Sequence, residues 1–142
     1  MRSPPEHIPL DPLRGVLWGF ALWAVATPVF ATVGNTFVPL PDSEALAPVL
    51  AGWIVLVTTT VALITTDYLR RTGFEGASAG LGFGALMAAT GLVLDSVMLV
   101  AAGLSFPGLD DERTRTVAAL MLVAYALIVV VPAGVAARRA HR

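Results

Sequence analysis

Asp95 is a carboxylic acid inside an otherwise apolar stretch at about 77–104. That stretch is long enough to cross a bilayer core of about 30 Å, and Asp95 would lie roughly 7 Å from the centre of the core. An acid at this depth costs about 2.5–3.5 kcal/mol on insertion scales, so it needs a hydrogen-bond partner, water or a proton. Because the sequence has no Arg or Lys at the same depth, we expect Asp95 to be neutral for much of the time and to donate a hydrogen bond.

Two kinds of chemistry fit an acid in this position. Ionisable residues inside a membrane commonly couple to protons or bind a ligand, so Asp95 is a candidate for either role. The alternative is a structural hydrogen bond that sets the register of neighbouring helices. Substituting Asp95 by Asn would separate these roles, because Asn keeps a hydrogen bond but does not titrate.

Hydroxyl groups on the other apolar stretches are the expected partners of Asp95. Tyr125 and Thr27 each lie near the middle of such a stretch. Residues 58–60 are three threonines, and because successive helical residues turn by about 100°, at least one hydroxyl should face inward. The predicted polar cluster, a candidate proton or ligand site, comprises Asp95, Tyr125, Thr27, Thr58, Thr59 and Ser96.

Small residues recur along one side of the stretch that contains Asp95. Their spacings of three and four are typical of helices whose backbones approach closely in lipid. Asp95 continues this side, so it should face protein rather than lipid. The pattern fits either packing within one bundle or contact with a second chain. The predicted helix-packing or oligomer face comprises Gly76, Gly80, Gly84, Ala88 and Gly91.

Four apolar stretches have the length of about 20 residues that a spanning helix needs. Short segments with proline or glycine separate them, so sequential helices should be antiparallel neighbours. The chain is 56% hydrophobic and 13% charged, against about 25% charged in a typical soluble domain. We therefore predict an all-α fold: an integral-membrane antiparallel bundle of four transmembrane helices, forming a single domain of residues 1–142, with spans at about 15–33, 45–66, 77–104 and 116–137.

Arginine residues indicate the orientation of this bundle. Cytoplasmic loops carry an excess of basic residues, so an unequal split marks the cytoplasmic side. We predict a multi-pass protein of the cell (plasma) membrane with both termini cytoplasmic. The nine Arg with no Lys, and the abundance of Ala, Gly, Val and Pro, suggest a GC-rich bacterial genome, so we expect this membrane to be a bacterial inner membrane. Seven arginines fall on the predicted cytoplasmic side (Arg2, Arg14, Arg70, Arg71, Arg138, Arg139, Arg142) and two on the other (Arg113, Arg115).

The first apolar stretch has an alternative interpretation as a cleaved signal peptide. Residues 29–31, Val-Phe-Ala, resemble a small-residue cleavage site, and two arginines precede the apolar run. The run is long for the apolar region of a signal peptide, which favours a retained transmembrane helix.

Three segments carry a family resemblance. They are the G-L-V-L-D of residues 91–95, the F-P-G-L of residues 106–109 and the aliphatic run around Tyr125 in residues 122–128. Together they resemble a bacterial family of small four-helix integral membrane proteins that is catalogued only as a domain of unknown function. The resemblance implies the same four-span architecture and points again to Asp95 and Tyr125. It implies no activity.

The sequence favours a non-enzymatic role. It has no cysteine, no second buried carboxylate and no set of metal ligands, so we expect no cofactor and no metal. The leading hypothesis is an oligomeric or accessory, structural membrane subunit. Its expected partners are membrane lipids and either further copies of itself or a partner membrane protein, with no nucleic acid, since the net charge is −1.

Two alternatives stay open. The first is a small proton-coupled transporter that works as a dimer through Asp95 and associates through the glycine face. The second is an intramembrane enzyme that modifies a lipid or isoprenoid, with Asp95 and Tyr125 as acid and base.

Overall fold

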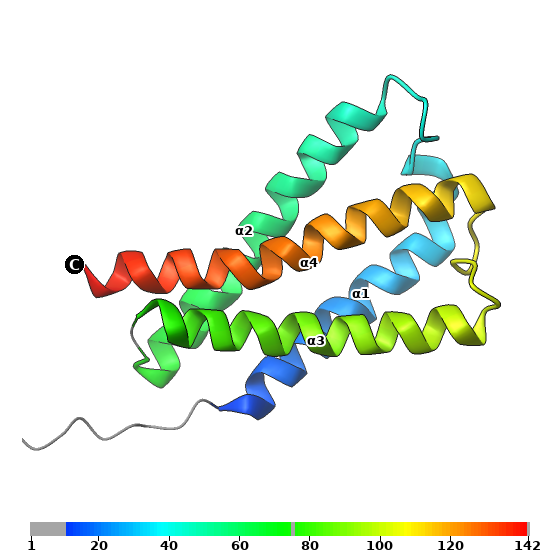
Figure 1. The fold of residues 1–142 in the computed structure, drawn as a ribbon. Coiled ribbons are helices and arrows are strands. Elements are labelled where there is room, and N and C mark those ends of the chain that lie inside the picture. The colour runs from blue at the N-terminus through cyan, green and yellow to red at the C-terminus, as the bar shows by residue number, and fades with distance from the viewer. Residues whose placement is uncertain (1–10, 75, 142) are drawn as a thin grey trace, which may run out of the picture.

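The computed structural model describes residues 11–74 and 76–141, and these residues form four helices and no strand. Figure 1 shows the helices and the short loops that join them. The prediction of an all-α chain with four helices long and apolar enough to span a membrane is confirmed. The helices are α1 (Pro12–Phe37), α2 (Leu46–Thr72), α3 (Ala77–Ala101) and α4 (Asp111–Ala140).

Capping side chains extend the first and last helices beyond the predicted spans. Asp11 is the N-cap of α1 and accepts from the backbone N–H of Arg14 at 3.4 Å. Asp110 caps α4 and accepts from the N–H of Arg113 at 2.8 Å. Such bonds satisfy N–H groups that have no partner within the helix, so both helices begin before the apolar run does.

The helix α3 ends earlier than predicted. Its last residue is Ala101, and the backbone then turns through Gly103 and Leu104, whose φ values of 72° and 68° are left-handed. A left-handed conformation at this point interrupts the helical hydrogen bonds, so the apolar residues after Ala101 lie in the loop rather than in the helix.

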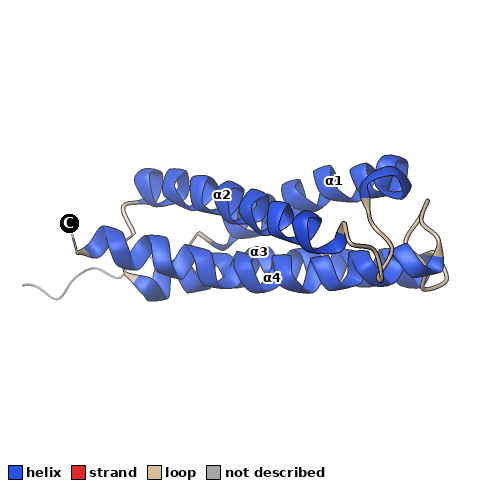
Figure 2. Cartoon of the chain, turned by 90° about the horizontal axis from the view of Figure 1, so that it is seen from above, coloured by secondary structure: helices blue, strands red, loops and turns tan. Residues whose placement is uncertain are grey.

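The four helices form two layers. Figure 2 shows α1 and α2 in one layer and α3 and α4 in the other, and Figure 1 shows the first pair crossing the second obliquely. The extensive contacts are α3 with α4, α1 with α3, and α2 with α4. The helices α1 and α2 therefore pack mainly on the other layer and not on each other.

The glycine face of α3 packs within the chain. A side chain at Gly80 or Gly84 would collide with the backbone carbonyl of Pro132 or Ile128 on α4. Ala88 lies in the buried core, and Gly91 accommodates the ring of Tyr125.

Gly76 does not belong to this contact surface. It is the N-cap of α3, with a φ of 91°, and a Cβ added there would meet no atom within 4 Å. The predicted face is thus an internal α3–α4 contact from Gly80 to Gly91, as the packing alternative proposed, and α4 covers the surface that a dimer would have used.

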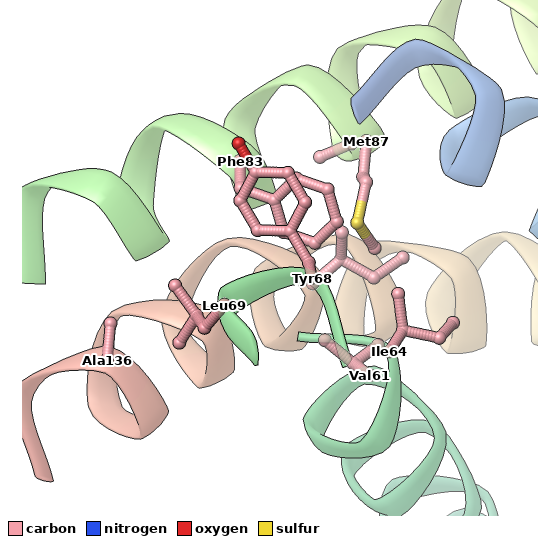
Figure 3. Packing of buried hydrophobic residues seen from close by; sticks show 9 residues of the cluster. Val61, Ile64, Tyr68, Leu69, Phe83, Met87 and Ala136 are labelled. Atoms are coloured by element: carbon pink, nitrogen blue, oxygen red, sulfur yellow. The ribbon is translucent and has the colours of Figure 1, made fainter. Parts of the chain in front are cut away.

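Two buried apolar clusters hold the layers together. In one cluster the ring of Tyr68 on α2 stacks on Phe83 of α3, with centroids 3.9 Å apart and planes 5° apart. Figure 3 shows these stacked rings beside Leu69 and Met87. The other cluster surrounds Phe30 near the opposite end of the bundle.

The outer surface is rich in exposed aliphatic side chains. Val25, Val97, Leu122 and Val130 are each more than 60% exposed, and they come from three helices. Such a surface would favour association in water, whereas lipid tails solvate it well. Each of the four helices could cross a membrane, which is consistent with a multi-pass membrane protein.

Candidate functional site

Asp95 is buried where α1, α3 and α4 meet. Its side chain is 6% exposed. The indole Nε1–H of Trp23, on α1, donates to one carboxyl oxygen at 2.8 Å. The hydroxyl of Tyr125, on α4, forms a hydrogen bond with the other oxygen. The acid therefore has a polar partner on each neighbouring helix, and both partners are uncharged.

Two glycines, each one helical turn before a site residue, make this arrangement possible. A Cβ at Gly91 would lie 2.8 Å from the Tyr125 ring, so the absence of a side chain lets the phenol reach Asp95. A Cβ at Gly19 would lie 2.6 Å from the carbonyl oxygen of Met87, so α1 approaches α3 closely one turn before Trp23. The hydrogen bonds of Asp95 thus depend on close contact between helices.

The donors around Asp95 define what the site can do. An indole N–H only donates, so the oxygen that faces Trp23 must accept. The phenol can donate or accept, so the other oxygen can be an ionised acceptor or can carry a proton that it donates to Tyr125. The arrangement can therefore hold either form of the acid without a metal or a basic side chain.

A cavity of about 670 Å³ extends from this site into the space between α1 and α2. All four helices contribute to its wall, and most of the lining side chains are aliphatic or aromatic. The chain has three tryptophans, and all three line the cavity. The cavity is open rather than enclosed, because α1 and α2 pack mainly on the other layer. The polar lining residues are Asp95, Tyr125, Thr27 and Thr60.

Thr27 brings an unused polar atom to this wall. Its side chain is 9% exposed, and its hydroxyl oxygen has no hydrogen-bond partner. Buried hydroxyls are nearly always hydrogen-bonded, since leaving one without a partner costs about 1–3 kcal/mol. The oxygen atom is itself fully buried, so this unpartnered group lies behind the cavity wall rather than on its open surface.

The structure does not bring all the predicted residues to Asp95. Ser96 is exposed, and its hydroxyl donates to the carbonyl of Leu92 at 2.7 Å. A rotation of about 100° from Asp95 turns this residue away from the bundle. Among the threonines of α2, Thr59 is exposed and Thr58 lies outside the cavity wall, whereas Thr60 lines it. Ser96, Thr58 and Thr59 therefore do not belong to the cluster around Asp95, and Thr60 is the threonine of α2 that lines the cavity.

Trp23 is the site residue that the sequence reasoning missed. An indole near the middle of a transmembrane helix has an N–H that needs an acceptor, and few acceptors exist at that depth. That requirement was the available signal. The partner could not be chosen from the sequence, because the α1–α3 contact depends on tertiary packing.

No group of three or more His, Cys, Asp or Glu residues able to hold a metal ion occurs in residues 11–74 and 76–141. In comparisons with known proteins, no family model, no curated protein and no solved structure matches the chain. The resemblance to a four-helix membrane family therefore stays a prediction, and the site must be interpreted from its own geometry.

Proposed function

We propose that this chain is an integral membrane protein that binds an amphiphilic molecule from the lipid phase in the cavity between α1 and α2. The observation that carries the proposal is an open apolar cavity whose wall includes a buried acid, Asp95, hydrogen-bonded to Tyr125. An apolar pocket with a few polar groups at one place is the usual form of a small-molecule site. The apolar wall would take a hydrocarbon chain, and the polar groups would orient its head.

The size of the cavity favours a small molecule over a partner helix. Ligand sites typically measure about 300–1,000 Å³, and this cavity measures about 670 Å³. A transmembrane helix about 10 Å wide and 30 Å long occupies roughly 2,400 Å³. One or two hydrocarbon chains would fill the cavity, whereas a helix would leave most of its volume outside.

The other hypotheses receive less support from the same geometry. A purely structural or accessory subunit would need no cavity beside its buried acid. A dimeric transporter was expected to assemble through the glycine face, which α4 covers in the chain itself. An enzyme would need a second chemical group near Asp95 and Tyr125, and no other acid lines the described part of the cavity.

Binding can be tested with the protein's own tryptophans. In detergent, a brominated monoacylglycerol should quench the emission of the wild-type protein, because bromine near an indole quenches it and Trp18, Trp23 and Trp53 all line the cavity. Ala124→Phe fills part of the cavity and should reduce saturable quenching. Ala119→Phe on the same helix is the matched control, since Ala119 is exposed and lies outside the cavity. Equal quenching of all three proteins would contradict the proposal.

We also propose that the protein lies in the plasma membrane with the arginine-rich end of the bundle facing the cytoplasm. The ends of the four helices place five described arginines at one end and two at the other. The positive-inside bias favours the first end as cytoplasmic. The five are Arg14, Arg70, Arg71, Arg138 and Arg139, and the two are Arg113 and Arg115.

The absence of cysteine from the sequence makes this orientation easy to test. Glu44→Cys places one thiol in the loop between α1 and α2, and Ala140→Cys places one at the last residue of α4. A membrane-impermeant maleimide should label Glu44→Cys in intact cells and Ala140→Cys only after permeabilisation. The reverse pattern would show that the bundle is inverted.

A further inference from the structure

The two ends of the bundle differ in the sign of their charge. The sequence at and beyond the end where α2 and α4 finish contains seven arginines and four acids, a net charge of +3. The sequence at the other end contains two arginines and five acids, a net charge of −3. An anionic partner is therefore attracted to the first end and repelled from the second. The four acids are Glu6, Asp11, Asp67 and Glu75, and the five are Asp42, Glu44, Asp110, Asp111 and Glu112.

Arginines from two helices come together at the positive end. Leu69 of α2 and Ala136 of α4 are both fully buried in one apolar cluster, and Figure 3 shows them beside each other. This contact joins the last turns of the two helices, which carry the basic residues. We call these four exposed residues the arginine surface: Arg70, Arg71, Arg138 and Arg139.

Three of these four arginines have no ion pair with an acid in residues 11–74 and 76–141. Only Arg71 has one, in which its Nε lies 2.8 Å from a carboxyl oxygen of Asp67. A guanidinium carries five N–H donors and can bind a phosphate through two parallel hydrogen bonds. The arginine surface can thus bind phosphate oxygens without breaking an ion pair between described residues.

Exposed apolar residues lie on the same helices, nearer the middle of the bundle. Leu63 is 67% exposed and precedes Arg70 by seven residues, so both lie on one side of α2. Val130 is 65% exposed and precedes Arg138 by eight residues, with exposed Gly134 between them. These spacings place the apolar residues roughly 10–12 Å from the arginines along the helix axes. A phospholipid matches both parts of this surface, whereas a free phosphate ion would contact only the arginines.

We infer that the arginine surface binds anionic phospholipids of the adjoining leaflet, with the phosphate on the arginines and the chains along α2 and α4. Phospholipids without net charge bind there more weakly, because they gain less from the positive charge of this end. No arginine is among the described residues that line the cavity, so this surface is separate from the ligand site proposed above.

Native mass spectrometry of the protein in detergent can count the bound lipids. The probes are phosphatidylglycerol and phosphatidylcholine with identical chains, and the wild type should bind the first more tightly. Each basic residue beside anionic lipid changes affinity by about fivefold, so Arg139→Gln should weaken phosphatidylglycerol by about that factor. Arg138→Gln combined with Arg139→Gln should weaken it about ten- to thirtyfold and leave phosphatidylcholine nearly unchanged.

Arg115→Gln is the matched control. Arg115 is also an exposed arginine of α4 but lies at the negative end, so this variant should bind both lipids as the wild type does. Circular dichroism of each variant checks that the helices are retained.

Three results would overturn the assignment of this surface. The first is equal binding of the two lipids by the wild type, and the second is an equal loss in Arg115→Gln and Arg139→Gln. The third is displacement of phosphatidylglycerol by excess inorganic phosphate beyond that caused by sodium chloride of the same ionic strength, which would indicate a site for a free anion. Ala124→Phe, which fills the cavity, should leave the bound phosphatidylglycerol unchanged, so the two binding proposals can fail separately.

Discussion

The close approach of α1 to α3 at Gly19 makes a sharp prediction about both fold and site. A Cβ added at Gly19 would lie 2.6 Å from the carbonyl oxygen of Met87, whereas real Cβ contacts essentially never fall below 3.0 Å and are ordinary from 3.4 Å. The obstructing atom belongs to the backbone of α3, so it cannot rotate away as a side chain would. In Gly19→Ala, α1 must therefore move off α3 by about 0.4–0.8 Å at this point.

The movement has two measurable consequences. Overpacking of this kind typically costs about 1–3 kcal/mol, and a gap of 0.5–1 Å forfeits about a quarter to a half of the dispersion energy between facing atoms. The Trp23–Asp95 hydrogen bond, now 2.8 Å, lies one turn further along α1. A shift at the upper end of this range, directed along the bond, would lengthen it to about 3.6 Å, at which it no longer counts as a hydrogen bond.

Both consequences can be followed in detergent. Unfolding by a denaturing detergent gives the free energy, and a ¹⁵N–¹H spectrum shows one indole resonance for each of the three tryptophans. Trp23→Phe assigns the resonance of interest, which should move upfield in Gly19→Ala. Gly134→Ala is the control, because a Cβ there meets no atom within 4 Å and alanine favours a helix by up to about 1 kcal/mol.

Some results would refute the reasoning. If Gly19→Ala is as stable as Gly134→Ala, then α1 does not approach α3 as closely as the structure places it. If stability falls but the Trp23 resonance stays in place, the close contact exists but does not position the indole on Asp95.

Two further predictions concern the partners of Asp95 and the cap of α4. Trp23→Phe and Tyr125→Phe each leave one carboxyl oxygen of Asp95 without its partner, so each should cost about 1–3 kcal/mol of unfolding free energy, and wild-type stability in either variant would contradict the site. The backbone N–H of Arg113 holds the pKa of Asp110 below its usual value of 3.8. Asp110 therefore stabilises α4 above that usual value and loses this effect as the pH falls through the lowered pKa. Asp110→Asn should be less stable than wild type at neutral pH and converge with it in acid, and a constant difference across the titration would exclude this linkage.

The positions of the four helices were predictable because a helix that crosses the lipid core must be apolar along its length. A span must be apolar over about 20 residues, and each of the four stretches met that condition on its own. The ends were less predictable, because they depend on single polar side chains. Asp11 and Asp110 extend α1 and α4 beyond the apolar runs, and left-handed residues after Ala101 shorten α3.

The part of the site that was predictable from the sequence is the part that depends on one face of a single helix, α3. The spacing of small residues on α3 indicated that Asp95 should face protein, and the structure places this acid in the interior beside Tyr125. The choice among three adjacent threonines and the role of Trp23 depend on how helices rotate against each other. The sequences of α1 and α2 have no row of small residues as long as that of α3 that would indicate their rotation.

The cavity arises from the distribution of small residues among the helices. Glycines let α1 pack closely on α3 and let α3 pack closely on α4. The glycine of α2, Gly52, meets no neighbouring atom, so it does not bring α2 close to α1.

The sides of α1 and α2 that border the cavity instead carry Trp18, Phe37, Trp53 and Leu56. Large side chains on both borders keep the two helix backbones apart, because close approach in lipid requires small residues. The same packing that brings Trp23 to Asp95 therefore leaves an opening beside it. If these large residues are replaced by alanine or glycine, we expect α1 and α2 to move closer together. Between two helices that already pack against each other, the same substitutions would instead leave voids.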